Sequence, residues 1–516
     1  MTVSTEALTS ISTPERLDSR LGTLEFVDGV PSGETAERVY DQLDFVHGLN
    51  VFLDAFAGAS TYAIRKGFHD VGLEDNSILI FSELMGSESL FLTANADTVY
   101  FVGIVDLTSG PMVVETPPQA LGLFDDMWFQ WIVDFGLSGP DRGEGGRFLL
   151  VPPGYDGPLP DSGYHVGHSR TTRVLLLGRS FLTDDDPAPT VETIRRTLKL
   201  YPYARGGFGT SVGTLLGGHV QPDPPAPILE TTFVEGSGKA FNTIPPSDFG
   251  FFELLNELVQ EEPAGSGDIE LMGQLAAIGI VKGEPFEPDE RMRRILEDAA
   301  AVGSAASRAL IFEPRASEGF AYYDDRSAWQ LPLWVGGYSF ETPPPLVTME
   351  GIKPLPPTGA RTLNSRTAFF YTYTGITPAM CMRLTGLGSQ YIIATKDADG
   401  ARLDGGQTYR VTLPPDIPAA RFWSLTAYDN ETRSMLQTPQ RFPRAGSQSY
   451  PTPAATANDD GITTITFGPE RPSDSPEGNW IQTTEGKGWF PILRLYSPLE
   501  SYFDKSWRPS EIEVVD

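Results

Sequence analysis

Residues 421–429 have the sequence RFWSLTAYD, in which two kinds of side chain alternate. Successive side chains of a β-strand point to opposite faces of its sheet. We therefore expect Trp423 in a hydrophobic core and Ser424 on the opposite face of the same strand. That opposite face, which runs from Phe422 to Tyr428, is polar and aromatic. It can stack against a ligand ring and hydrogen-bond to it, or it can simply face solvent and neighbouring strands.

The same β pattern continues on both sides of this stretch. Short runs rich in β-branched and aromatic residues recur, with turn residues between most of them. The expected strands are 368–374, 390–395, 408–413, 420–428, 463–466 and 489–496. Such a series is typical of an antiparallel sandwich or jelly roll. Residues 351–516 are therefore predicted to form a C-terminal β-sandwich or jelly-roll-like domain.

The N-terminal half begins with a helical pattern and then changes to strands. Apolar residues between 35 and 72 recur at three- and four-residue spacing, which predicts a helix. Short β-prone runs follow between residues 88 and 177. We expect a flexible polar arm at residues 1–35 and an N-terminal β-rich domain with a leading helix at residues 36–185.

Helical periodicity predominates in the middle of the chain. The expected helices are 191–201, 247–258, 268–278 and 288–312. Residues 186–350 are therefore predicted to be a helical, loop-rich connecting region. The predicted fold class is mostly β with a helical middle (α+β), in which two antiparallel β-sandwich or jelly-roll-like domains are bridged by helices.

The chain is strongly acidic, with 38 Lys and Arg against 68 Asp and Glu and a formal net charge of -30. Nucleic-acid binding requires basic patches, so this function class is excluded, and attachment to an anionic membrane surface is disfavoured. The apolar runs are too short to cross a bilayer, and the N-terminus lacks the features of a secretory signal. We expect a cytoplasmic protein with no nucleic-acid or membrane partner, and a homo-oligomer stays open.

A second motif, NADTVY at residues 95–100, lies far upstream of the first. In a strand, Asn95 and Asp97 would point to one side, and Thr98 and Tyr100 to the other. Asp97 is then our candidate catalytic acid or base, and the other three are candidate binding residues. The alternative is an Asx turn, in which Asn95 and Asp97 accept hydrogen bonds from nearby backbone amides.

These two motifs, in this order, resemble a two-domain bacterial family known as domain of unknown function 1254 (N-terminal) and domain of unknown function 1214 (C-terminal). The segments GNWI at 478–481 and RLY at 494–496 also match the family's C-terminal pattern. The resemblance implies β-sandwich domains, the C-terminal one jelly-roll-like and similar to glycan-processing and carbohydrate-binding folds. It implies no particular reaction, because one fold serves many functions.

Arg494 is a charged residue in the otherwise apolar run 491–496. A buried guanidinium needs a partner. The resemblance offers two: Asp429, as a structural ion pair, or the carboxylate of a ligand. The candidate binding residues of the C-terminal half are Ser424, Tyr428, Asp429, Trp480 and Arg494.

Common cofactor and nucleophile motifs are absent from the sequence. His165 and His168 lack the further ligands of a zinc site, so we expect no metal and no cofactor. Our first hypothesis is a hydrolase acting on a glycan or another polar small molecule, with Asp97 as the acid or base. The second is a non-catalytic ligand-binding or assembly protein with an aromatic binding surface that includes Trp480.

Overall fold

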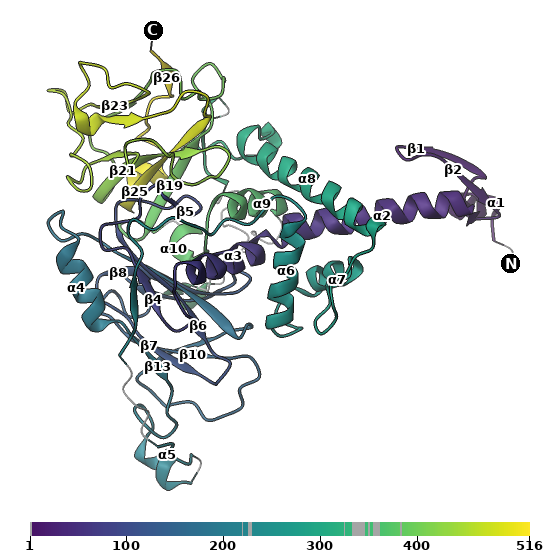
Figure 1. The fold of residues 1–516 in the computed structure, drawn as a ribbon, viewed down its shortest axis with the longest axis horizontal. Helices are drawn as coiled ribbons and strands as arrows, with labels where there is room; N and C mark the ends of the chain where they lie inside the picture. Colours follow the sequence, from purple (N-terminus) through teal and green to yellow (C-terminus); the bar gives the residue numbers. More distant parts are fainter. Residues whose placement is uncertain are drawn as a thin grey trace.

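A computed structural model describes residues 3–218, 220–224, 230–324, 326–332, 346–348, 351–353, 362–381 and 384–515. The described chain has a β-rich N-terminal half, a β-rich C-terminal half stacked on it, and a group of helices to one side of both (Figure 1). This arrangement confirms the predicted α+β fold with two β-rich parts and helices between them in the sequence.

Two sheets form the N-terminal half, and most of their neighbouring strands are antiparallel, as expected. The larger sheet has the order β14 (Phe233–Glu235), β4 (Ile78–Ile80), β6 (Val99–Asp106), β12 (Arg173–Ser180), β8 (Ala120–Asp126) and β9 (Trp131–Gly136). The smaller sheet has the order β11 (His165–His168), β10 (Arg147–Val151), β7 (Met112–Glu115) and β13 (Lys199–Pro202). Two edge pairs, β10 with β11 and β4 with β14, are parallel.

A hydrophobic core fills the space between these two sheets. Phe101 and Phe124 of the larger sheet and Val114 and Phe148 of the smaller one belong to the same buried cluster. The rings of Phe124 and Phe148 lie 5.5 Å apart, centre to centre. Side chains from two facing sheets that pack in this way define a sandwich.

The C-terminal half repeats the two-sheet plan. Its larger sheet has the order β16 (Trp329–Gln330), β19 (Ser389–Ala394), β25 (Trp489–Pro498), β21 (Ala419–Asp429) and β22 (Arg444–Gly446). Its smaller sheet has the order β24 (Trp480–Gln482), β23 (Thr463–Gly468), β20 (Tyr409–Leu413) and β26 (Glu513–Val514). Trp423 on β21 is 7% exposed, which confirms its predicted place in the core. Ser424 is fully buried as well, because that face of β21 lies against the N-terminal half.

Helices connect and flank the two halves. Figure 1 shows α2 (Gly33–Asp54) as a long rod that reaches from the body to the N-terminal arm. The other long helices are α3 (Phe56–Asp70), α4 (Ala188–Thr197), α6 (Gly250–Glu261), α7 (Ile269–Ala277) and α8 (Glu290–Phe312). Asp268 and Asp289 cap α7 and α8 by accepting hydrogen bonds from backbone N–H groups of the first turn.

Two predicted regions need correction. The arm predicted to be flexible contains α1 (Thr5–Ile11) and a three-stranded sheet of β1 (Arg16–Ser19), β2 (Gly22–Val27) and β3 (Val30–Pro31). Arg38 of α2 donates a hydrogen bond to the Thr23 carbonyl, so this sheet is tied to the helix. Residues 186–350 are also more than a connection, because β13, β14 and β15 (Phe241–Asn242) pair with β7, β4 and β5 (Ser89–Leu90).

The strand expected at residues 368–374 is wrong, because most of it belongs to the helix α9 (Leu363–Thr372). Seven of the ten residues of α9 are buried, so no polar face reveals a helical period in the sequence. A short apolar run of this kind cannot be assigned to helix or strand from periodicity alone. The aromatic side chains of α9, which have high β propensity, favoured the wrong prediction.

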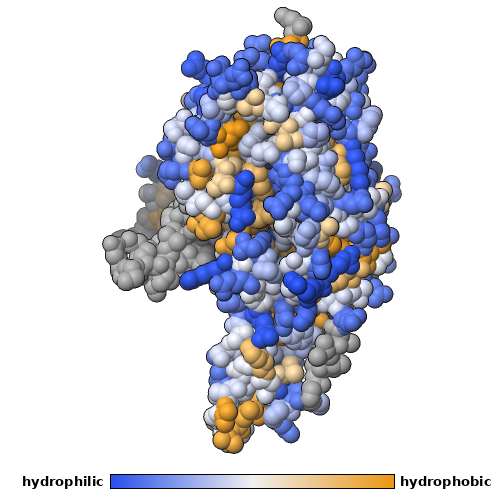
Figure 2. Space-filling view, turned by 90° about the vertical axis from the view of Figure 1, so that its left-hand side faces the viewer, coloured by the Kyte–Doolittle hydropathy of each residue, from blue (hydrophilic) through white to orange (hydrophobic). Residues whose placement is uncertain are grey.

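The face drawn in Figure 2 is mostly hydrophilic. Apolar side chains gather at the lower tip in that view, where α5 (Val212–Leu216) projects from the body. Phe208, Val212 and Leu216 are 55%, 71% and 84% exposed there. Within the described residues, no helix is both long enough and apolar enough to cross a membrane.

Candidate functional site

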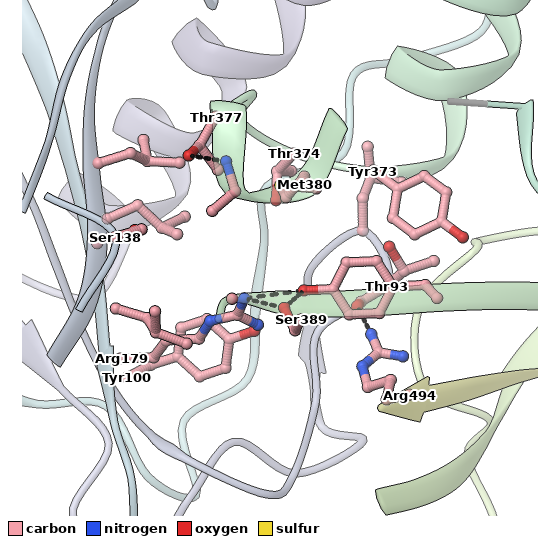
Figure 3. A pocket seen from close by; sticks show the side chains of 18 of the residues that line it. Thr93, Tyr100, Ser138, Arg179, Tyr373, Thr374, Thr377, Met380, Ser389 and Arg494 are labelled. Atoms are coloured by element: carbon pink, nitrogen blue, oxygen red, sulfur yellow. Dashed lines mark hydrogen bonds between the residues drawn. The ribbon is translucent and has the colours of Figure 1, made fainter. Parts of the chain in front are cut away.

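A pocket of about 60 Å³ lies where the two β-rich halves meet. Its polar wall comes from β6 and β12 on one side and from β19 and β25 on the other. The side chains of this wall are Tyr100, Arg179, Ser389, Tyr391 and Arg494. Figure 3 shows Arg179, Tyr100 and Ser389 on one side of the view and Thr374, Thr377 and Met380 facing them.

Arg179 reaches from the N-terminal half to the C-terminal half. Its Nη2 donates to the hydroxyl oxygens of Ser389 and Tyr391, at 2.7 and 2.8 Å. Burial lowers the pKa of the Arg179 guanidinium, but the neighbouring tyrosines, Tyr391 first, raise it above its ordinary value overall. Arg179 is therefore a permanent positive charge, and the structure shows no described carboxylate within ion-pair distance of it.

Arg494 is a second cation in the same wall and is 3% exposed. Its Nη2 donates to the carbonyl oxygen of Thr93, whereas Nε and Nη1 are buried without a hydrogen-bond partner. The guanidinium lies 5.2 Å from the ring centre of Tyr391 and 5.5 Å from that of Tyr428. Buried polar groups are nearly always hydrogen-bonded. Two unsatisfied donors at the wall of a pocket therefore indicate a missing acceptor.

Tyr391 lies between these two cations. Its hydroxyl is 2.5 Å from the Ser389 hydroxyl and accepts a hydrogen bond from Arg179. Burial raises the pKa of the Tyr391 phenol, but the charges of Arg179 and Arg494 outweigh burial and lower the pKa below its ordinary value of 10.0. The pKa of Tyr100 shifts in the opposite direction, because burial raises it.

Apolar side chains line other parts of the pocket. They are Phe91, Leu92, Leu121, Leu123, Leu177 and Met380. One water molecule needs roughly 10–15 Å³ on the measure used for such cavities. A volume of about 60 Å³ therefore holds a few waters or a ligand of few non-hydrogen atoms. Not every lining residue is fully buried. Those that are only partly buried include Ser138, Leu177, Arg179 and Thr374.

The NADTVY motif forms a turn before β6, so the expected strand alternation does not apply to Asn95 and Asp97. Asn95 Oδ1 accepts hydrogen bonds from the Asp97 backbone N–H and the Thr98 hydroxyl, both at 2.9 Å. Its Nδ2 donates to the Tyr100 hydroxyl at 2.8 Å. This is the Asx-type turn that we set out as the alternative. Tyr100 lines the pocket, whereas Asn95, Asp97 and Thr98 are fully buried and do not.

The negative charge of Asp97, our candidate catalyst, is balanced by an arginine of the C-terminal half. Its Oδ1 lies 2.8 Å from Nε of Arg444, an ion pair in which both side chains are 0% exposed. The contact lies outside hydrogen-bond geometry, so charge attraction dominates it. Oδ2 accepts a 2.6 Å hydrogen bond from Ser424 and a 3.4 Å bond from Tyr496. A sealed, paired carboxylate of this kind connects two domains and has no access to a substrate.

The remaining predicted residues lie at separate places. The Tyr428 hydroxyl donates to the Ala94 carbonyl and is fully buried at the contact between the halves. Trp480, on β24, donates its indole N–H to the carbonyl oxygen of Gly468 in the smaller C-terminal sheet. Neither side chain lines the pocket.

Asp429 is not the partner of Arg494, which corrects that part of the prediction. The register of β21 and β25 places Arg494 opposite Ser424 and Asp429 opposite Trp489. Asp429 instead pairs with Lys487 at 3.0 Å and accepts from the backbone of Glu431.

Three residues of the polar wall escaped the sequence prediction: Arg179, Ser389 and Tyr391. Arg179 carries the same signal as Arg494, since it ends an apolar run at 174–178. Ser389 and Tyr391 have no such signal, because their place in the pocket follows from the position of β19 beside β25.

In the described part of the chain, no group of three or more His, Cys, Asp or Glu side chains could hold a metal ion.

Comparisons with known proteins support the two-domain organisation. Residues 76–202 match a family described as protein of unknown function (DUF1254), and residues 388–500 match one described as protein of unknown function (DUF1214). No curated protein matches the chain.

Solved structures similar to this chain include the following two. The VPA0106 protein from Vibrio parahaemolyticus is 16% identical with a TM-score of 0.50, covering 92% of this chain and 100% of that one. An uncharacterized protein from Burkholderia cenocepacia is 12% identical with a TM-score of 0.38, covering 93% and 95%. The first of these supports the overall fold and carries no information on function. By its two matched segments and their order, the chain joins an N-terminal DUF1254 domain to a C-terminal DUF1214 domain.

Proposed function

We propose that this protein binds a small organic anion, a carboxylate, in the pocket between its two halves. The observation that carries the proposal is Arg494, a buried cation with two unsatisfied donors at the pocket wall. Arg179 adds a second positive charge from the other half. Arginine is well suited to carboxylates, because its charge is permanent and its planar donors match two acceptor oxygens.

The mixed lining of the pocket defines the ligand further. The two cations favour a carboxylate, and the apolar side chains, such as Leu121, Leu123 and Met380, favour a short hydrocarbon part. A carboxylate that accepts from Nε or Nη1 of Arg494 would satisfy donors that otherwise remain unpaired at a cost of about 1–3 kcal/mol each. The pocket volume of about 60 Å³ limits the ligand to a few non-hydrogen atoms.

A glycan hydrolase that uses Asp97 is the weaker candidate. Asp97 is paired with Arg444 and has no exposed surface, so it can neither protonate a glycosidic oxygen nor activate a water. The aromatic surface expected around Trp480 lies apart from the pocket as well. The cytoplasmic location of the protein and its assembly into a homo-oligomer are still predictions.

Calorimetric titration with acetate and with acetamide tests the proposal. The two probes have nearly the same shape, but only acetate is charged, so we expect acetate to bind and acetamide not to. Removal of a charged hydrogen bond costs about 1.5–3 kcal/mol, so Arg179→Gln should weaken acetate binding by roughly 10- to 100-fold. Circular dichroism of the variant checks that the fold is retained.

Arg421→Gln is the matched control. Arg421 is exposed and stacks on Phe181, 4.5 Å from its ring centre, and it does not line the pocket. Its replacement removes the same charge from the same region and should leave acetate binding unchanged. The proposal fails if acetate and acetamide bind alike, if Arg179→Gln binds acetate as the unmodified protein does, or if glucose binds where acetate does not.

A further inference from the structure

We propose that Tyr391, as a phenolate, is the anion that balances Arg179 and Arg494 in the empty pocket, and that a bound carboxylate takes over this role while Tyr391 takes up a proton. The inference rests on the proposed carboxylate site and specifies it further: ligand binding is coupled to the binding of one proton. It also makes Tyr391 the residue of this pocket that exchanges protons.

The charge balance of the pocket is the first argument. Arg179 and Arg494 place two positive charges in the wall of one small pocket, with Tyr391 between them. Among the described residues, neither has a carboxylate within 4.0 Å, whereas the buried Arg444 has Asp97. Burying uncompensated charge costs several kcal/mol per ion. An anion inside the pocket removes much of that cost.

The position of Tyr391 is the second argument. Its hydroxyl lies 2.8 Å from Nη2 of Arg179, and its ring centre lies 5.2 Å from the guanidinium carbon of Arg494. Tyr391 therefore accepts a hydrogen bond from one cation with its hydroxyl and presents its ring to the other. The Ser389 hydroxyl, 2.5 Å away, can donate to a phenolate and stabilise it further.

The other titratable groups around Tyr391 do not compete for this role. Burial raises the pKa of four neighbouring tyrosines above 10.0. They are Tyr100 on β6, Tyr373 before α10 (Pro378–Cys381), Tyr428 on β21 and Tyr496 on β25. They stay protonated where the Tyr391 phenol, with its lowered pKa, ionises first. The buried carboxylate of Asp97 accepts a hydrogen bond from Tyr496 at 3.4 Å and already has Arg444 as its partner.

The proposed exchange balances in atoms and in charge. The empty pocket holds two guanidinium charges and one phenolate charge, a net of one positive charge. A carboxylate enters, the phenolate oxygen takes one proton from solvent to become a phenol, and the net charge of the pocket is again one positive. No carbon–hydrogen or carbon–oxygen bond breaks in this step, and no co-reactant other than the proton is needed.

The coupling has a definite direction with pH. Where Tyr391 is ionised in the empty protein, every further pH unit removes the proton that binding requires. Acetate affinity should then fall by about tenfold per pH unit, and at lower pH it should be constant. Tyr391→Phe removes the internal anion, so its acetate affinity should not depend on pH and should exceed that of the unmodified protein at high pH.

Calorimetric titration with acetate in two cationic buffers of different ionisation enthalpy, Tris and triethanolamine, measures the proton count. We expect uptake approaching one proton per bound acetate at high pH in the unmodified protein and none in Tyr391→Phe. The tyrosinate absorbance in the near ultraviolet should fall on acetate addition. Tyr155→Phe, at a half-buried tyrosine outside the pocket, should behave as the unmodified protein.

The outcomes separate the two proposals. Acetate binding without proton uptake at any pH overturns the coupling and leaves the carboxylate site standing. No acetate binding at all overturns the carboxylate site, and the coupling with it. If Tyr391→Phe does not fold, the two-buffer measurement on the unmodified protein decides alone, because uptake either accompanies binding or does not.

Discussion

At the scale of single residues, the buried arginines of this protein differ in how their charge is compensated. Arg444 has the carboxylate of Asp97, and Arg433 lies over the ring of Tyr371 at 4.0 Å. Arg494 has only one carbonyl oxygen and two aromatic faces, although it is as deeply buried as the others. Of these three arginines only Arg494 lines the pocket, so its uncompensated charge indicates a binding site, whereas Arg433 and Arg444 make structural contacts.

We predict that Arg444→Met destabilises the protein by about 3–5 kcal/mol, because it leaves Asp97 buried without a partner. Urea unfolding monitored by fluorescence measures the loss. The double variant Arg444→Met with Asp97→Asn removes both charges and should recover most of the stability. A double variant as unstable as the single one would show that the pair contributes through packing and not through charge.

Asp134 should make stability depend on pH. It is 3% exposed and accepts hydrogen bonds from Trp131 Nε1 and the Thr377 hydroxyl, yet burial raises its pKa from 3.8 to about 7. The folded protein therefore holds a proton that the unfolded chain has already lost. Stability should fall as pH rises from about 4 to about 7 and then level off, by up to roughly 4 kcal/mol.

Asp134→Asn isolates this effect. Its amide keeps the shape of the side chain and cannot ionise, so unfolding free energies at pH 5 and pH 8 should differ much less than in the unmodified protein. Asp156→Asn, at an exposed position, is the control and should not change the pH dependence. An unchanged pH dependence in Asp134→Asn would assign the effect to another group.

At the scale of secondary-structure elements, one row of residues across the larger N-terminal sheet holds the strand of Arg179 in place. The row runs Phe101, Gly178, Gly122 and Phe135 through β6, β12, β8 and β9. The two rings fold over the two glycines and meet at 6.0 Å between centres. Because side chains alternate along a strand, Arg179 then points to the opposite face, which is the pocket wall.

Gly178→Ala should disturb this row. An added Cβ would lie 2.2 Å from carbon atoms of the Phe101 ring, so the ring or the strand must move. We expect a loss of about 1–3 kcal/mol, the usual cost of overpacking a core. Gly273→Ala in the exposed face of α7 has open space around its Cβ and should instead stabilise by about 0.5–1 kcal/mol. Chemical denaturation of both variants shows whether the signs differ as stated.

At the scale of the whole molecule, one hydrophobic cluster extends through both halves. It includes Phe52 and Phe129 of the N-terminal half together with Trp423 and Trp489 of the C-terminal half. Buried polar contacts cross the same boundary, among them Ser424 with Asp97 and Arg179 with Ser389. Separation of the halves would expose this apolar surface and leave buried polar groups without partners.

Scanning calorimetry should therefore show one cooperative transition for the full chain, although chains of this size often unfold domain by domain. Acetate at saturating concentration should raise the temperature of that transition, because its site contains residues of both halves. Two separate transitions, or stabilisation of only one of them, would contradict this picture of a shared core.

The sequence by itself determined the β-rich halves, most strands of the C-terminal sheets and the helices around α6 to α8. These elements follow from local patterns: a period of two in β21 and a helical period in α7 and α8. The family resemblance rests on short segments as well, chiefly residues 95–100 and 421–429, and is confirmed. Patterns of this kind depend on neighbours within a few residues and can be recognised without a structure.

The tertiary structure alone decided which polar groups meet. Asp97 and Arg444 are 347 residues apart in the sequence, and Arg179 and Tyr391 are 212 apart. The sequence marked Arg494 as a charge that needs a partner, but the register of β25 against β21 excluded Asp429 and left a pocket instead. In the same way, most residues of α9 are buried, so its sequence shows no polar face by which a helix could be recognised. The physical reason is common to these cases: the charge balance and burial of a side chain depend on groups brought close only by folding.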